Sequence, residues 1–330
     1  MKKENISKNI INWYDNNKRE LPWRKHSSKK QIEYFTLVSE FMLQQTQVKT
    51  VIPFFNNFIK KIPNLYTLSK VNNSKLMKCW QGLGYYSRAS NLKKTAKIIV
   101  SQFNGNLPKS VEELQMLPGI GEYTSRAILA IAFNKQIIPL DGNVERILKR
   151  VFYLKKDKEV TKDNINKKKN FFGKSNRPRD YAQAIMEIGA LICKPINPLC
   201  YKCPVSNNCK SFKKKDFKIK AKNKFKKIKY FEAEIYQNKN KYLLVKNNKF
   251  KFLKNFFIFP MKEVEKNIFS LSTSSKINIK LSNMDMNIVL NKKNKMIKIR
   301  NSYLIDKKNI NNKILPSFTK KIFNTVSKNL

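Results

Sequence analysis

The first 210 residues carry apolar side chains at spacings of three and four, which is the period of a helix with one buried face. Short segments containing Pro or Gly separate these stretches. None of the stretches shows the alternation of apolar and polar residues that a half-buried strand would have. We therefore predict an all-α domain over residues 1–210. Its helices are expected at 31–43, 47–60, 91–103, 122–133, 143–153 and 181–192, after an amphipathic helix at the N-terminus.

The pattern changes after the basic stretch 211–228, which we predict to be a linker that can lie along phosphates. Beyond this stretch, apolar residues alternate and β-forming residues are frequent. Residues 229–330 are therefore expected to form a smaller α/β domain. The predicted strands are 229–237, 241–246, 277–290 and 296–304, the Phe-rich 252–260 is a strand or a loop, and 315–326 is a candidate last helix.

The composition adds a strong positive charge. The chain of 330 residues has 69 Lys+Arg against 22 Asp+Glu, a net charge of +47, and such an excess indicates a polyanionic partner such as DNA. A compositional bias is the alternative, because the lysines are spread over the whole chain among many Asn and Ile. The sequence contains no apolar run of about 18 residues, so we expect no membrane span. The N-terminus has no apolar signal core, so the cytoplasm is the expected compartment.

Four cysteines lie close together as Cys193, Cys200, Cys203 and Cys209, with the spacing C-x6-C-x2-C-x5-C. Structural zinc sites usually pair their cysteines in two CxxC knuckles, and only one knuckle is present here. The spacing therefore favours a [4Fe–4S] cluster held by four thiolates. A zinc site, a disulfide pair and four unrelated cysteines are the alternatives. The fifth cysteine, Cys79, lies far from this set.

A glycine-containing turn follows in the segment LPGIGEYTSRAI at 117–128. One helix is expected to end near Met116 and the next to begin near Glu122, with Gly119 and Gly121 between them. Glycines permit backbone angles that side chains forbid, and they leave amide groups bare at the start of a helix. Such a turn can hold a phosphate of the DNA backbone. An ordinary turn between two helices is the alternative.

Two carboxylates stand out as candidates for chemistry. Asp141 comes just before a predicted helix, which it could simply cap. Glu40 lies beside Val38 and Phe41 in a predicted helix, where burial would raise the pKa of its carboxyl and favour the protonated form. A general acid needs that form, although a buried structural glutamate is the alternative. An acid and an anionic stabiliser together suit the breaking of a glycosidic bond.

Several motifs together resemble the adenine DNA glycosylase family of the helix–hairpin–helix superfamily. They are SEFMLQQTQV, GLGYYSR, LPGIGEYTSRAI and LDGNV, followed by the four cysteines, and the match runs from LPWR at 21–24 to Cys209. The resemblance implies a multidomain protein, with an all-α helix–hairpin–helix glycosylase domain, an iron–sulfur loop at 193–209 and a small α/β Nudix-like domain. It implies base excision repair of double-stranded DNA by a monomer that removes adenine opposite 8-oxoguanine or guanine.

The resemblance also suggests a role for each catalytic residue. Glu40 would protonate the flipped adenine, Asp141 would stabilise the sugar cation, and Asn143 would hold Asp141 or the catalytic water. Tyr123 stands where strand-cutting relatives have a lysine that forms a Schiff base with the sugar. A phenol cannot make this bond, so a monofunctional glycosylase is implied.

The DNA contacts implied by the family come from three places. Gln45 and Tyr85 would wedge into the base stack, Thr46 would lie beside 8-oxoguanine, and the hairpin residues Gly119 and Gly121 would hold a phosphate. Helix surface or core packing is the alternative for Gln45, Thr46 and Tyr85.

The lesion-reading element of the family, Phe-Ser-His, has its best counterpart here in Leu281-Ser282-Asn283. Only the serine is kept, so Ser282 is a candidate contact and recognition of 8-oxoguanine by this domain is in doubt. A glycosylase for another base, such as thymine opposite guanine, and a non-catalytic DNA-binding protein remain as alternatives for the chain.

Overall fold

The computed structural model describes residues 3–155, 160–218, 227–281, 284–297, 299–310 and 315–328. Internal contacts divide the chain into two compact units. The first consists of Met1–Val71 with Ser87–Ala221, and the second of Asn72–Tyr86 with Lys222–Leu330. None of the described helices is both long and apolar enough to cross a membrane.

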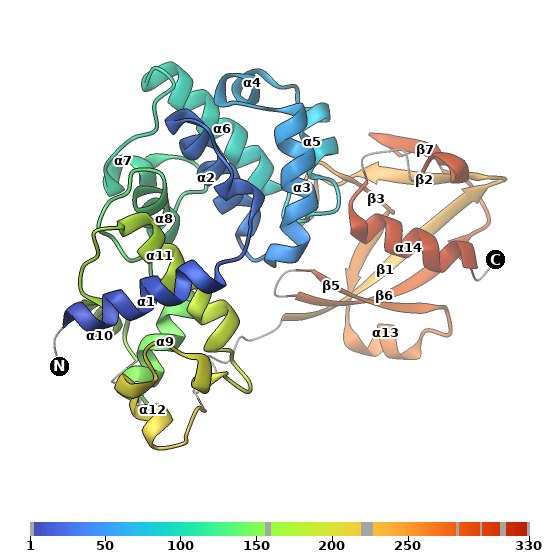
Figure 1. Cartoon of the computed structure of the whole chain (residues 1–330). Coiled ribbons are helices and arrows are strands. Elements are labelled where there is room, and N and C mark those ends of the chain that lie inside the picture. The colour runs from blue at the N-terminus through green and yellow to red at the C-terminus, as the bar shows by residue number, and fades with distance from the viewer. Residues whose placement is uncertain are drawn as a thin grey trace. The chain divides into compact units, whose positions relative to one another are not determined.

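The first unit is helical, as the apolar period predicted, and each helix expected from the sequence is present (Figure 1). The segment expected at 181–192 is an α-helix that continues as a π-helix, Ile188–Ile192. The bounds are α1 (Lys3–Asn17), α2 (Lys29–Leu43), α3 (Val48–Lys61), α4 (Leu65–Lys70), α6 (Ser87–Gln102), α7 (Val111–Met116), α8 (Glu122–Ile131), α9 (Gly142–Phe152), α10 (Lys162–Lys168), α11 (Pro178–Glu187) and α12 (Lys210–Lys213).

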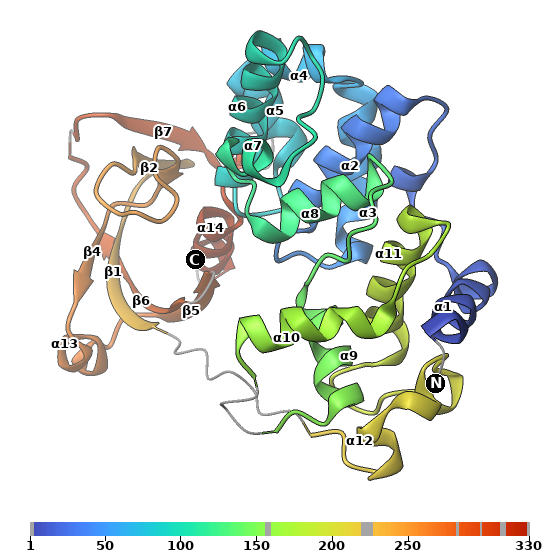
Figure 2. The ribbon, with the colours of Figure 1, turned by 90° about the vertical axis from the view of Figure 1, so that its left-hand side faces the viewer.

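The helix α9 lies in one of the hydrophobic cores of this unit. Its apolar residues Val144, Ile147, Leu148 and Val151 are buried together with residues of α1 and α11. The helices α1 and α11 lie side by side (Figures 1 and 2). Two hydrogen bonds of 2.8 Å from the guanidinium of Arg177, just before α11, to the Asp15 carboxylate connect them.

The second unit contains a mixed sheet, in which the described strands follow the order β3-β2-β1-β6-β5. The long strand β1 pairs in parallel with β6 and antiparallel with β2 and β4, while β7 pairs with β2. A parallel pair needs a long crossover, here from β1 to β6. The bounds are β1 (Lys227–Asn238), β2 (Lys241–Lys246), β3 (Phe257–Ile258), β4 (Met261–Val264), β5 (Lys276–Leu281), β6 (Met284–Lys293) and β7 (Ser302–Asp306).

Two strand predictions are wrong in their bounds. The segment predicted as one strand at 277–290 is a hairpin, because β5 and β6 pair antiparallel with Leu281 opposite Met284. Both strands alternate in the same way, so the period alone does not show that they are two separate strands. The candidate contact Ser282 lies outside the described residues. The strand predicted at 296–304 begins later, at Ser302.

Helices complete the second unit. The predicted last helix is α14 (Ser317–Lys328), whose apolar residues join the core formed by the sheet. Two further helices, α5 (Asn73–Trp80) and α13 (Lys266–Leu271), were not predicted from the sequence. The helix α5 belongs to the same compact unit as the sheet. After this helix, the centroid of the Tyr86 ring lies 4.5 Å from the centroid of the Phe256 ring.

Candidate active site and cysteine pocket

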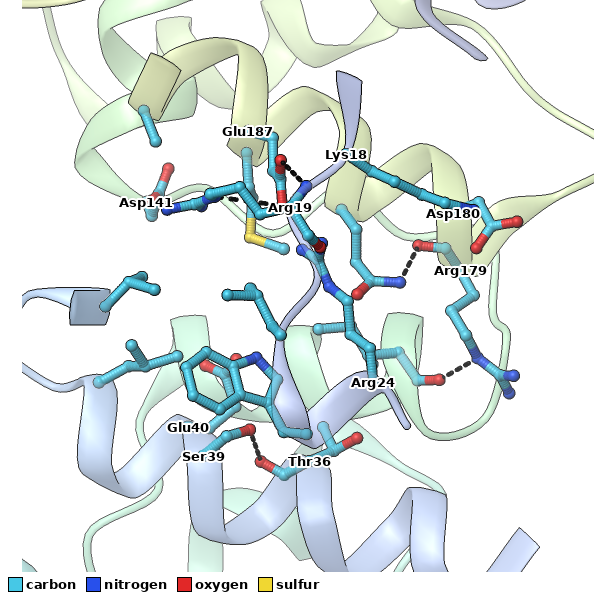
Figure 3. A pocket seen from close by; sticks show the side chains of 18 of the residues that line it. Lys18, Arg19, Arg24, Thr36, Ser39, Glu40, Asp141, Arg179, Asp180 and Glu187 are labelled. Atoms are coloured by element: carbon cyan, nitrogen blue, oxygen red, sulfur yellow. Dashed lines mark hydrogen bonds and ion pairs between the residues drawn. The ribbon is translucent and has the colours of Figure 1, made fainter. Parts of the chain in front are cut away.

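A pocket of about 770 Å³ opens in the first unit, among α2, α8, α9 and α11 (Figure 3). This volume is typical of small-molecule sites and can hold a nucleobase. The pocket brings together all four residues predicted to be catalytic, and two predicted DNA contacts lie on its wall. These residues are Glu40, Tyr123, Asp141 and Asn143, with Gln45 and Thr46 beside them.

Glu40 lies near the end of α2, where it is only 6% exposed although its side chain faces the pocket. Burial raises the pKa of its carboxyl to about 7, and the nearby Asp141 charge acts in the same direction. A hydrogen bond with Tyr123 opposes this shift by stabilising the carboxylate. A substantial share of Glu40 therefore carries a proton at neutral pH, as a general acid requires.

Asp141 is the N-cap of α9, so the predicted capping role is present along with a place in the pocket. Its Oδ1 accepts hydrogen bonds from the amides of Asn143 at 2.9 Å and Val144 at 2.7 Å. Its Oδ2 accepts a third, from the Asn143 side chain, at 2.8 Å. Burial raises the pKa of Asp141, whereas these hydrogen bonds and Arg146 lower it. Three hydrogen bonds and Arg146 stabilise the Asp141 carboxylate, whereas a single hydrogen bond stabilises that of Glu40. Asp141 is therefore the member of the pair that stays ionised.

Tyr123 stands in the first turn of α8 and completes the group. Its hydroxyl lies 3.6 Å from the Met186 sulfur and also bonds to Glu40. Burial and the two neighbouring carboxylates raise the pKa of this phenol well above its ordinary value. Tyr123 therefore stays neutral and acts as a hydrogen-bond donor.

The side chain of Asn143 is held in place by Arg146. The Arg146 guanidinium donates to Asn143 Oδ1 at 2.7 Å and to the carbonyl of Gly189 at 2.6 Å. Gly189, in the π-helix that follows α11, packs closely on the first turn of α9. A Cβ at this glycine would come within 2.5 Å of the Asn143 Cβ, so the close approach requires glycine here.

A second charged group in the pocket was missed by the sequence analysis. The carboxylate of Glu187, which is 1% exposed, receives a hydrogen bond from Arg24 and another from the Arg19 backbone amide (Figure 3). Arg24 belongs to the LPWR segment, which had served only as the start of the family match. Glu187 directly follows the apolar residues Ile185 and Met186, and Glu40 also has apolar neighbours in the sequence. A glutamate in such surroundings indicates a buried carboxylate, and this pattern could have identified Glu187.

The predicted hairpin is present, with α7 ending at Met116 and α8 beginning at Glu122. Gly119 has φ +86°, and a side chain there would also press on Phe41, so this position needs glycine. Gly121 is the N-cap of α8, where no side chain bonds to the helix amides and a Cβ would meet nothing within 4 Å. Bare amides at an open helix start are suited to an anion.

The predicted wedge residues lie in two strained turns. Gln45 has φ 57° and Tyr85 has φ 47°, both in the left-handed region that L-residues rarely adopt. Both side chains are exposed, and Thr46 is half-buried. Arg88 holds the turn that contains Gln45, because its guanidinium donates to the carbonyls of Met42 and Gln44.

The four cysteines predicted as ligands are free thiols that line one small pocket, together with Ile147, Arg150 and Val151 of α9. Its other walls are mainly apolar, and the Arg150 guanidinium lies 3.4 Å from the Cys193 sulfur. Burial raises the pKa of the Cys203 thiol to about 12, and its charge interactions with the other three cysteines act in the same direction. Among the described residues, no group of three or more His, Cys, Asp or Glu side chains is arranged so that it could hold a metal ion.

Comparison of the sequence with known families and proteins gives consistent results. Residues 38–170 match the model of the HhH-GPD superfamily base excision DNA repair protein. An adenine DNA glycosylase of Buchnera aphidicola subsp. Baizongia pistaciae is 39% identical over 281 residues, covering 83% of this chain and 79% of that protein. The adenine DNA glycosylase of Homo sapiens is 39% identical over 213 residues, covering 61% of this chain and 38% of that protein.

Solved structures show the same helical fold. A thermostable thymine-DNA glycosylase superposes with a TM-score of 0.56 at 25% identity, covering 64% of this chain and 97% of that one. An endonuclease III in a DNA complex superposes with a TM-score of 0.52 at 21% identity, covering 65% of this chain and 98% of that one.

Proposed function

Because the chain belongs to the adenine DNA glycosylase family, we propose that it removes adenine paired with 8-oxoguanine or guanine in double-stranded DNA. It is a base excision repair enzyme that hydrolyses N-glycosyl bonds. The observation that supports the proposed mechanism best is the buried Glu40, with its pKa raised to about 7, beside Asp141 and Tyr123 in one pocket.

The first step is departure of the base. Adenine leaves with the electron pair of the bond between its N9 and the sugar C1′, and the Glu40 carboxyl gives its proton to N7. Protonation turns a poor leaving group into a neutral one, and general acids of this kind contribute about 10²–10⁴-fold to a rate. The hydrogen bond between Tyr123 and Glu40 holds the carboxyl in the pocket.

The second step is capture of the sugar. The positive charge that develops at C1′ is stabilised by the Asp141 carboxylate, which three hydrogen bonds hold in place. A water molecule then adds its oxygen to C1′ and gives up its proton to a carboxylate. With Tyr123 in the place of a lysine no Schiff base forms, so the enzyme is monofunctional and leaves the strand uncut.

The DNA is held by the hairpin and by the two strained turns. Amides around Gly119 and Gly121 bind a phosphate, as the uncapped start of α8 supports. Gln45 and Tyr85 fill the gap that the flipped adenine leaves, and Thr46 lies beside the opposite base. Flipping costs a few kcal/mol of lost stacking, which such wedges offset.

The cysteine pocket is proposed to hold a [4Fe–4S] cluster through Cys193, Cys200, Cys203 and Cys209. Although the four sulfurs of the described cysteines are not arranged around a metal ion, the donor set supports this assignment, because four free thiols share one mainly apolar pocket. A bound cluster would order the loop 193–209, with its exposed lysines Lys194 and Lys202 and the adjacent Lys210 directed toward phosphates. The mixed-sheet unit is proposed to be a Nudix-like domain that contacts the 8-oxoguanine strand, with Ser282 as a candidate contact.

Base release from duplexes with adenine opposite 8-oxoguanine, guanine, cytosine and thymine tests the proposed function. Release is expected opposite 8-oxoguanine and guanine, with none of thymine from a mismatch with guanine. The Glu40→Gln variant should bind the A·8-oxoguanine duplex as the wild type does and release no base, because only the proton donor is removed. Wild-type release by this variant, or a preference for thymine, would contradict the proposal.

A further inference from the structure

The segment Lys210–Lys218, here called the strap, follows the last cysteine. Its charge led us to predict it as part of a linker along phosphates. In the structure it lies against the cysteine pocket, because the side chains of Phe212 and Phe217 line that pocket together with the four cysteines. Phe217 is half-buried there, and Phe212 is 38% exposed.

Arg150, on the last turn of α9, joins the strap to the cysteine loop. Its Nε donates to the Phe217 carbonyl at 3.1 Å, and its guanidinium lies 6.0 Å from the centre of the Phe217 ring. The same guanidinium donates to the carbonyls of Lys194 at 2.6 Å and Pro195 at 2.9 Å. One buried side chain therefore fixes both the strap and the start of the cysteine loop.

Asp216 fastens the strap at a second point. Its carboxylate accepts hydrogen bonds from the Tyr153 hydroxyl at 2.8 Å and from the Lys155 ammonium at 3.1 Å, both just past the end of α9. The Asp216 amide also donates to the Ser211 carbonyl at 3.0 Å, which closes the strap on itself. Because Phe217 is the next residue, the position of Asp216 sets the position of this ring.

We infer that the strap is a cover for the cysteine pocket and that Asp216 is the positioning residue that keeps it closed against water and dissolved oxygen. This inference rests on the proposed cluster as the protected group. The alternative, that the strap is only a linker on its way to the sheet, predicts that its loss leaves the cysteines as shielded as before.

The test compares wild-type full-length protein, purified without oxygen, with Asp216→Asn and Phe217→Ala. The matched control is Lys213→Ala, which changes the charge of the same strap at an exposed side chain. The visible absorption of the cluster is followed after transfer to air-saturated buffer. Loss of the net contribution of one or two hydrogen bonds predicts decay about three- to ten-fold faster in Asp216→Asn, with Lys213→Ala unchanged.

Three outcomes decide the inference. Equal decay rates in wild type, Asp216→Asn and Phe217→Ala overturn it. If Asp216→Asn fails to fold, Tyr153→Phe removes only the hydroxyl that holds Asp216, and it too must decay faster. If the wild type contains no iron, the proposed cluster is wrong, and the strap is then tested by iodoacetamide. Alkylation of the four cysteines must be faster in Asp216→Asn than in wild type, and equal rates overturn the cover.

Discussion

Gly189 and Asn143 pack so closely that the glycine has no room for a side chain. A Cβ added at Gly189 would lie 2.5 Å from the Asn143 Cβ and 3.1 Å from the backbone carbonyl of Asn143. These are main-chain or near-main-chain atoms, so a larger residue has to push the π-helix away from the first turn of α9. Asn143 supports Asp141, which makes this contact relevant to catalysis.

The Gly189→Ala variant is expected to slow base release by about ten- to a hundred-fold, because a displacement of about 1 Å in a catalytic group can cost about 10²-fold in rate. Duplex binding should change little. The matched control is Gly142→Ala, where the added methyl group lies next to Asp141 but meets nothing within 4 Å. Single-turnover rates and gel-shift binding measure both effects. A wild-type rate in Gly189→Ala would show that the Asn143 position is unimportant.

The rate of base release is expected to fall as the pH rises through about 7, because the proton donor Glu40 loses its proton with that pKa. Tyr123→Phe removes a hydrogen bond that lowers the pKa of Glu40, so the fall should move to higher pH. Single-turnover rates between pH 5 and 9 check both statements. A flat profile in the wild type would remove Glu40 from the role of acid.

The raised pKa of Glu40 also makes the stability of the fold depend on pH. Between its ordinary pKa of 4.5 and about 7, Glu40 binds a proton in the folded state that the unfolded state has released. The free energy of unfolding therefore falls as the pH rises across this window, by about 3 kcal/mol at most. Urea unfolding of Glu40→Gln should show less of this fall than the wild type. An identical pH dependence in both proteins would contradict the raised pKa.

Glu122 places a negative charge in the first turn of α8, where the hairpin is proposed to meet a phosphate. Arg126 partly neutralises this charge across 3.7 Å. Glu122→Gln is expected to raise the duplex affinity by about two- to five-fold at low salt, the worth of one exposed charge interaction. Glu112→Gln, on the preceding helix, removes the same charge from an exposed site away from the turn and should have no effect. Fluorescence anisotropy over a salt series distinguishes the two variants.

Gln45 can be removed without straining its turn, because glycine adopts its φ of 57° freely. Gln45→Gly should keep stability within about 1 kcal/mol of the wild type. Base release from a duplex should fall about ten-fold or more, since the wedge offsets a flipping cost of a few kcal/mol. Asn255→Gly, exposed and at φ 68°, is the control for the backbone effect. Unchanged release would make Gln45 a surface residue only.

The sequence predicted the longer helices of the first unit because each buries one face, and burial leaves a three- to four-residue period. The short helices α4, α10 and α12 were not predicted, since four to seven residues are too few to establish that period. The pocket residues Glu40 and Asp141 were also found, since polar groups in apolar surroundings or at helix starts stand out locally, whereas Tyr123 was identified only through the family resemblance. Glu187 offered the same local signal, but its pairing with Arg24 could not be found in this way, because the two residues are 163 positions apart. Local patterns also cannot show that β1 pairs in parallel with β6, or that the strap turns back to the cysteines.

The contact between α1 and α11 has a consequence for how the protein is made. The Arg177 guanidinium meets the Asp15 carboxylate across 162 residues, so the first helix finds its partner only after almost the whole first unit has been synthesised. Until then a nascent chain leaves the apolar side of α1 uncovered on the ribosome. Pausing of translation within the first 180 codons would therefore prolong exposure of a surface prone to aggregation, whereas pausing after the cysteines would not.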